Sequence, residues 1–221
     1  MIAVTTARVT DNPADEYFRN QSFALQSWLR VFEAVIVLGP YQKHLASPIT
    51  RFYPSENFPK VYDAVDICAD QTEWACIINS DIWVHPSFKR IEEKLRTKKA
   101  VAASSWRWTF DPAVGVDPCA HEDYGIDFFA AQPGAWEMVY REMQNSAQGE
   151  IDSPAKHLRL GAPQWDQYML GVFFMKFAAM GFYNLTDARI IRHPIHGDRR
   201  HYNSIPTVHI PHWPVMGSSI L

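Results

Sequence analysis

The hydrophobic residues in the first half of the chain follow two alternating patterns. Residues 2–5, 34–38 and 75–78 are short, mostly apolar runs, which is the pattern of strands that are buried on both faces. Residues 15–32 instead repeat apolar side chains three and four positions apart, which predicts a helix with one buried face. The chain therefore begins as an alternation of strands and helices.

Further segments continue this alternation. Short segments that are rich in small, β-branched or aromatic residues predict further strands at residues 49–53, 100–104, 126–131 and 188–191. Helical repeats predict helices that begin next to the prolines at positions 59, 86, 133 and 163. Residues 107–122 are rich in Pro, Asp and Gly and predict a long loop. The order of these elements predicts an α/β fold with a mostly parallel central sheet and helices on both faces.

Length and composition limit the architecture and the class of protein. The chain has 221 residues, of which 47% are hydrophobic and 20% are charged, so we expect a single domain with one core over residues 1–221. A net charge of −3 argues against a surface that binds nucleic acid as a whole. The three cysteines form no C-x-x-C pair, and no apolar stretch is long enough to span a membrane. We expect a cytoplasmic protein with no membrane span and no evident obligate protein partner.

Polar side chains follow the apolar run at residues 75–78, where the sequence reads Asn79-Ser80-Asp81. Open α/β sheets bind their ligands at the carboxyl ends of the strands. Two oxygen ligands, two residues apart at such an end, suit Mg²⁺ or Mn²⁺ that carries a diphosphate. The alternative interpretation of Asn79 and Asp81 is a turn that only terminates the strand.

Histidines and arginines are concentrated in the last part of the chain. His193 and His196 follow the last predicted strand, where an imidazole could complete a coordination sphere begun by Asp81. Arg199 and Arg200 belong to a group of arginines that could hold a phosphate through bidentate hydrogen bonds. A polar surface loop with ordinary surface charge is the alternative for both groups.

Two further carboxylates are candidates for chemistry. Asp166 lies in the first turn of a predicted helix, where the helix dipole stabilises a carboxylate whether or not it has a function. Beside Trp165 it could equally act as a general base or bind an acceptor hydroxyl. Asp127 interrupts the apolar run at 126–131, and because an unpaired buried charge is costly, it requires a partner or a functional site.

The loop after the first predicted strand is a candidate nucleotide contact. It contains Thr5, Thr6 and Arg8 at a place where doubly wound sheets bind nucleotides. The chain has no Gly-rich phosphate loop, no G-x-S-x-G, no H-E-x-x-H and no Walker sequence. Hydrolase, zincin and P-loop interpretations therefore have no support.

Taken together, these segments resemble nucleotide-sugar-dependent glycosyltransferases of the GT-A fold. The resemblance is carried, in order along the chain, by Ile2-Ala-Val-Thr-Thr, Ile77-Ile-Asn-Ser-Asp-Ile82, Gly125-Ile-Asp-Phe-Phe, Pro163-Gln-Trp-Asp166 and His193-Pro-Ile-His196. Members of this family use an Asp-x-Asp-type motif, and often a late histidine, to hold Mn²⁺ or Mg²⁺ on the diphosphate. The resemblance implies that Asp81 and His196 bind this metal ion, with Asn79 in place of the first carboxylate of the motif.

The resemblance also divides the chain into two halves. Residues 1–104 would bind the nucleotide sugar, with a UDP-sugar as the first expectation, and residues 105–221 would form the acceptor side and a C-terminal metal and phosphate segment. The acceptor would be a hydroxyl of a glycan, a small molecule or a modified DNA base. Asp166 would be the base if configuration inverts, and Asp166 or Asp127 would position the acceptor if it is retained. The expected donor contacts are Thr5, Thr6, Arg8, Asn79, Ser80, Asp81, Arg199 and Arg200.

The sequence leaves three alternative functions open. A sugar-phosphate nucleotidylyltransferase has a related architecture but carries a Gly-rich first loop, and residues 5–11 contain no glycine. A glycosyltransferase that modifies a hydroxylated base in DNA would use the C-terminal arginines on the backbone. A non-catalytic module that binds nucleic acid or carbohydrate would use the same basic and aromatic residues without turnover.

Overall fold

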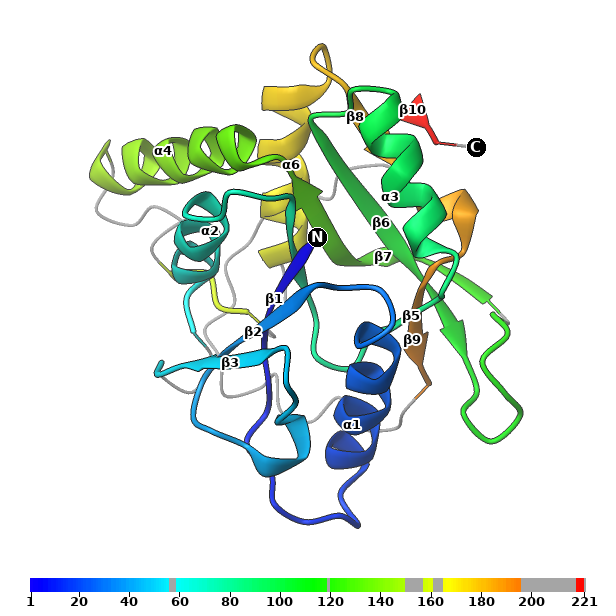
Figure 1. Ribbon diagram of the computed structural model, residues 1–221. Helices are drawn as coiled ribbons and strands as arrows, with labels where there is room; N and C mark the ends of the chain where they lie inside the picture. The colour runs from blue at the N-terminus through cyan, green and yellow to red at the C-terminus, as the bar shows by residue number, and fades with distance from the viewer. Residues whose placement is uncertain (56–58, 119, 150–156, 161–164, 196–217, 221) are drawn as a thin grey trace.

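The computed structural model describes residues 1–55, 59–118, 120–149, 157–160, 165–195 and 218–220 (Figure 1). These residues form one sheet of ten strands, whose main path has the order β10-β8-β6-β7-β4-β1-β2-β3. Along this path the strands are β10 (Ser218–Ser219), β8 (Phe182–Asn184), β6 (Ala102–Phe110), β7 (Ala120–Ala131), β4 (Ala75–Ile78), β1 (Ile2–Thr6), β2 (Ala34–Leu38) and β3 (Thr50–Tyr53). Beside this path, β9 (Ile191–Pro194) pairs with β6 and with β5 (Trp83–Val84).

The sheet is mostly parallel, as the alternation of strands and helices predicts. The strands β4, β1, β2 and β3 are parallel neighbours, and β6 is parallel to both β8 and β9. β7 is antiparallel to β4 and to β6, between which it lies. The carboxyl end of β4 therefore lies beside Phe128 of β7, and the amino-terminal part of β7 extends past it along β6.

Helices cover both faces of the sheet (Figure 1). α1 (Glu16–Trp28) and α3 (Phe88–Thr97) pack on one face, whereas α2 (Val61–Ala69), α4 (Pro133–Gly149) and α6 (Trp165–Phe177) pack on the other. Successive strand residues point to opposite faces, so Ile77 contributes to one core cluster and Ile78 to the other. Burial on both faces explains why these strands are continuously apolar.

Two predicted segments differ from the structure. Residues 107–122 are not a long loop, because β6 continues to Phe110 and β7 begins at Ala120. The aromatic and β-branched residues of this part of β6 favour a strand, which pairs with β7 and β9. The predicted last strand at 188–191 begins later, as β9, after a short 3-10 helix, η2 (Thr186–Ala188).

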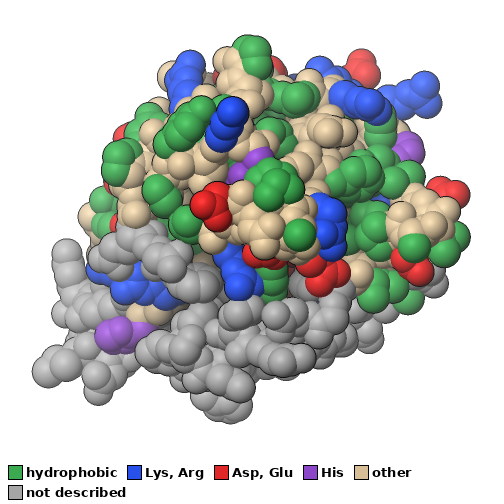
Figure 2. Space-filling model, turned by 90° about the horizontal axis from the view of Figure 1, so that it is seen from below, with side chains coloured by type: hydrophobic (Ala, Val, Ile, Leu, Met, Phe, Trp, Pro, Cys, Tyr) green, Lys and Arg blue, Asp and Glu red, His purple; other side chains and the backbone are tan. Residues whose placement is uncertain are grey.

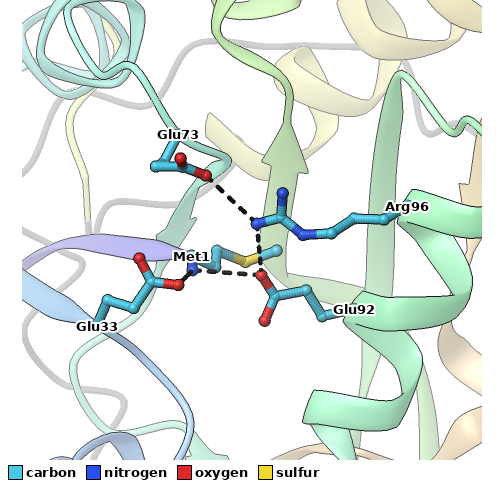
Figure 3. Close-up of polar contacts among 5 residues, drawn as sticks. All are labelled: Met1, Glu33, Glu73, Glu92 and Arg96. Carbon is cyan, nitrogen blue, oxygen red and sulfur yellow. Dashed lines mark hydrogen bonds and ion pairs between the residues drawn. The ribbon is translucent and has the colours of Figure 1, made fainter.

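The amino group of Met1 takes part in a network of ion pairs at the edge opposite the site described below (Figure 3). It donates to Glu33 at 2.7 Å and to Glu92 at 3.3 Å, and Arg96 pairs with Glu92 and with Glu73. This network connects the start of β1 to α3. None of the described helices has the length and apolar composition needed to cross a membrane.

Candidate functional site

Polar side chains gather at the edge of the sheet where β1, β2 and β4 end. Figure 2 shows the molecule from this side, and acidic, basic and histidine side chains lie there among hydrophobic ones. Parallel strands bring their carboxyl ends to one edge, and the turn of β7 back along β4 adds residues from the second half of the chain. This edge is the candidate site.

Asp81 and His193 form the first pair of the site. The Nε2 atom of His193 lies 3.3 Å from Oδ2 of Asp81, and 13% and 15% of the two side chains, respectively, are exposed. Burial by itself would lower the pKa of His193, but the charge and hydrogen bond of Asp81 and the charge of Asp127 raise this pKa above its ordinary value. The family resemblance implied His196 as the histidine that joins Asp81; in the structure His193 lies beside Asp81, and His196 lies outside the described residues.

Asp127 is buried, and among the described residues its carboxylate has two side-chain partners. Asn79 donates a hydrogen bond from its side-chain amide to Oδ1 of Asp127, and Arg107 lies 3.2 Å from Oδ2. Only 3% of Asp127 is exposed, so these partners supply the compensation that a buried carboxylate needs. The sequence correctly required a partner for Asp127 but did not identify Arg107, because the predicted loop at 107–122 obscured its place in β6.

Gly125 makes room for Arg107. A Cβ atom built on Gly125 would lie 2.5 Å from Nε and 2.6 Å from Cζ of Arg107, so the guanidinium passes directly over this glycine. Only a residue without a side chain permits so close an approach. Gly125 therefore belongs to the support of the Arg107–Asp127 pair.

Asp166 lies near this pair, in the first turn of α6. Its Oδ2 atom accepts a hydrogen bond from the backbone N–H of Ile126 at 3.2 Å. Burial, followed by the charge of Asp127, raises the pKa of Asp166 to about 6, although backbone hydrogen bonds and Arg107 act in the opposite direction. A carboxyl group with such a pKa changes its charge near neutral pH, which is the property of a general base.

The three predicted contacts after β1 lie at the same edge. The hydroxyl group of Thr6 donates to the carbonyl of Leu38 at 3.1 Å, which connects the ends of β1 and β2. Thr5 is buried, and its hydroxyl donates to the carbonyl of Thr6. The guanidinium of Arg8 lies 4.0 Å from the centre of the Tyr17 ring.

The structure therefore brings together most of the residues that the sequence selected. Thr5, Thr6, Arg8, Asn79, Ser80, Asp81, Asp127 and Asp166 all lie at this edge or next to it. His196, Arg199 and Arg200 lie outside the described residues, so their expected roles stay predictions. Besides Arg107, the sequence did not select Gln21 of α1, whose amide contacts Ser80. A buried glutamine within a helical repeat gives no local signal of this contact.

The chemistry of Asp81 and His193 fits one divalent ion. Two ligand atoms 3.3 Å apart can both lie about 2.1 Å from one metal centre, and a mixed oxygen and nitrogen set suits Mn²⁺. In the part of the chain that the structure describes, no group of three or more His, Cys, Asp or Glu side chains is arranged around such a centre. A metal ion here would therefore take its other ligands from the substrate, from water or from residues outside that part.

Comparisons with known proteins give little further information. No family model and no curated protein matches the chain. Among solved structures, the chain is similar to a protein of Bacillus anthracis that is assigned as a glucose-1-phosphate thymidylyltransferase and was crystallised with sucrose. The two share 11% identity and a TM-score of 0.48 over 84% of this chain and 87% of that one. These values are too low to assign a function.

Proposed function

We propose that this protein is a glycosyltransferase that moves a sugar from a nucleoside diphosphate sugar, most simply a UDP-sugar, to a hydroxyl acceptor. The observation that carries the proposal is the meeting of two carboxylate–cation pairs, Asp81–His193 and Asp127–Arg107, at the carboxyl edge of the sheet. A nucleoside diphosphate leaves with growing negative charge. Cations held at this edge would stabilise that charge as it develops.

The donor would lie across the ends of β1 and β4. Thr5, Thr6 and Arg8 would contact its nucleoside, and the segment Asn79-Ser80-Asp81 would face its diphosphate. Arg199 and Arg200 stay proposed phosphate contacts. In this arrangement residues 1–104 bind the donor, and residues 105–221 supply the catalytic and acceptor side, including Arg107, Asp127, Asp166 and His193.

Asp81 and His193 would hold Mn²⁺ or Mg²⁺, and His196 stays a proposed further ligand. Such an ion would supply Lewis-acid stabilisation to the diphosphate oxygens. Because a histidine binds metal in its neutral form, His193 would release its proton from the ion pair with Asp81 when the ion binds. Asn79 would contribute through its hydrogen bond to Asp127, not as a charged ligand.

Asp166 would be the general base. The acceptor hydroxyl would give its proton to the Asp166 carboxylate while its oxygen forms a bond to the anomeric carbon. The bond from that carbon to the diphosphate oxygen would break, and the nucleoside diphosphate would leave with the electron pair. A base on the enzyme implies inversion of configuration at the anomeric carbon. The buried, fully paired Asp127 would position Asn79 and the neighbouring acceptor.

A donor screen tests this proposal. The protein would be incubated with several UDP-sugars and Mn²⁺, and release of UDP would be measured by chromatography, with water or simple sugars as acceptors. A parallel reaction with UTP and a sugar 1-phosphate would be assayed for pyrophosphate. We expect UDP release without pyrophosphate, whereas pyrophosphate would identify a nucleotidylyltransferase. Binding of UDP or a sugar without any turnover would favour a non-catalytic module.

A further inference from the structure

A buried glutamine of α1 connects three segments at the candidate site. Gln21 is 1% exposed, and its side-chain amide lies within hydrogen-bond distance of Arg8, His44 and Ser80. One of its two amide orientations satisfies all of these neighbours. In that orientation Oε1 accepts from the N–H of Arg8 at 2.7 Å and from the hydroxyl of Ser80 at 3.2 Å. Nε2 then donates to the carbonyl of Arg8 at 3.3 Å and to Nε2 of His44 at 3.1 Å.

These contacts place Gln21 between the ends of three neighbouring strands. Arg8 follows β1, Ser80 follows β4, and His44 lies in η1 (Lys43–Leu45), which follows β2. The two hydrogen bonds to Arg8 use both backbone groups of the same residue, as a neighbouring strand would. One side chain therefore sets the position of the loop after β1 relative to the loop after β4.

The protonation state of His44 agrees with this orientation. Nε2 of His44 accepts a hydrogen bond only when the imidazole is neutral, and burial lowers the pKa of His44. The ring also packs on Phe18 of α1, with a distance of 4.2 Å between ring centroids. His44 is thus held in the form that completes the set of four hydrogen bonds around Gln21.

The segment that Gln21 holds contains the guanidinium of Arg8, which has a buried hydrogen-bond donor available for a ligand. One terminal nitrogen of the Arg8 guanidinium is buried and has no hydrogen-bond partner among the described residues. A second buried glutamine, Gln42, contacts the same segment through the N–H of Thr10 and the carbonyl of Ala7. A buried donor without a partner is uncommon, and a ligand oxygen that the loop admits would satisfy it.

We propose that Gln21 is a positioning residue of the donor site, which holds Arg8 and Ser80 at the separation that a nucleoside diphosphate requires. This inference rests on the proposed function, because that function makes Arg8 and Ser80 donor contacts. Gln21 contacts the two segments and not the donor. Its loss would leave each segment in place locally but would remove the connection between them, so that donor binding would have to order both segments.

The test compares two substitutions of Gln21 with a matched control in the full chain. Gln21→Met removes all four hydrogen bonds and preserves the size of the side chain. Gln21→Glu keeps the two hydrogen bonds that Oε1 accepts from Arg8 and Ser80, and it serves as a second variant if Gln21→Met folds poorly. Gln132→Met is the control, because Gln132 also donates from a part-buried amide, to the carbonyl of Ala100 at 2.6 Å, but lies at the opposite edge of the sheet.

Binding of UDP in the presence of Mn²⁺ would be measured by titration calorimetry, and kcat and KM would be measured for the donor on which the enzyme acts. We expect Gln21→Met to weaken UDP binding and raise the donor KM about tenfold, which corresponds to about 1.4 kcal/mol, with little change in kcat. Gln21→Glu should also weaken UDP binding, because a carboxylate oxygen would face the carbonyl oxygen of Arg8 in place of the donated hydrogen bond. Gln132→Met should change UDP binding by no more than about twofold, because distant sites act independently.

The outcomes separate the inference from the proposed function. If the natural protein binds UDP and Gln21→Met binds it equally well, Gln21 is not a positioning residue, and the proposed function is unaffected. An equal loss of binding in Gln132→Met would also overturn the inference, because it would indicate a general loss of stability. If the natural protein binds no nucleotide, the proposed function is wrong, and the role of Gln21 in donor binding is wrong with it.

Discussion

The imidazole of His193 lies 3.3 Å from a carboxylate oxygen of Asp81, and this contact joins β9 to the loop after β4. A second pair, Arg107 with Asp127, lies close enough for all four charges to interact. When His193 is protonated, the negative charges of Asp81 and Asp127 are balanced by the positive charges of His193 and Arg107. A change to one member therefore alters the charge that faces the others, which makes the site sensitive to single substitutions.

Substitution of Asp81 by Ala or Asn should abolish transfer and preserve the fold. The carboxylate contributes charge, and not packing, so we expect activity to fall by about a hundredfold or more. The free energy of unfolding should fall by about 1–3 kcal/mol, because the pair is mostly buried but the imidazole of His193 can become neutral without its partner. Activity assays and thermal denaturation would be compared. Unchanged activity with a large loss of stability would support the alternative of a strand-terminating turn.

Gly125→Ala should disrupt the Arg107–Asp127 pair. The added Cβ would lie 2.5 Å from Nε of Arg107, so the guanidinium must move away, and among the described side chains Asn79 would remain to donate a hydrogen bond to Asp127. We expect a loss of about 1–3 kcal/mol in unfolding free energy, measured by urea denaturation, together with reduced activity. Gly134→Ala is the control, because no atom lies within 4 Å of the added Cβ. Equal effects of the two substitutions would contradict this role of Gly125.

The activity should depend on pH through Asp166. If Asp166 is the base, kcat should fall as the pH is lowered through about 6, where its carboxylate becomes protonated. Asp166→Asn should lower kcat by a factor on the order of 10²–10⁴ and remove this pH dependence. If kcat of Asp166→Asn falls at acid pH in the same way as kcat of the natural protein, Asp166 is not the titrating base. The configuration of the product, measured by NMR, should be inverted.

The raised pKa of Asp166 also predicts how stability depends on pH. The free energy of unfolding should fall as the pH rises, whereas kcat should rise. A carboxyl group whose pKa is raised from 3.8 to about 6 in the folded protein stabilises the fold when protonated, and this contribution is lost as the pH rises from about 4 to above 6. Asp166→Asn should therefore be more stable than the natural protein at pH 8, by an amount on the order of 1–3 kcal/mol. The difference should vanish below about pH 4, which denaturation at several pH values would measure. A variant that is less stable at pH 8 would contradict the prediction.

Duplex DNA should not bind to this protein. Arg192 belongs to the basic C-terminal segment, yet it is buried, and its guanidinium donates to the carbonyls of Arg189 and Val116. Arg189 lies over the ring of Trp108 at 4.5 Å. We expect no binding in a fluorescence anisotropy titration at low salt. Binding that weakens with a slope of about −0.9 in log K against log[salt] for each neutralised phosphate would instead support a DNA acceptor.

Much of the fold could be predicted from the sequence, because the spacing of apolar residues along each segment indicates whether it is a strand or a helix. The apolar runs that became β1, β2 and β4 are continuous because both faces of the sheet are covered, and the helical repeat that became α1 has one buried stripe. The extended hairpin of β6 and β7 was missed. Its sequence contains turn residues, and pairing with β9 and between its own strands outweighs their local preference.

The kind of sheet and the segments that reach its carboxyl edge could be predicted, because both follow from local periodicity and from the residues at strand ends. The sequence also indicated that Asp127 needs a partner, because a buried charge is costly in any fold. Three contacts became known only from the folded chain: Arg107 is the partner of Asp127, His193 lies beside Asp81, and Gln21 contacts Arg8 and Ser80. These contacts depend on the order and register of strands from distant parts of the chain, which no local spacing encodes.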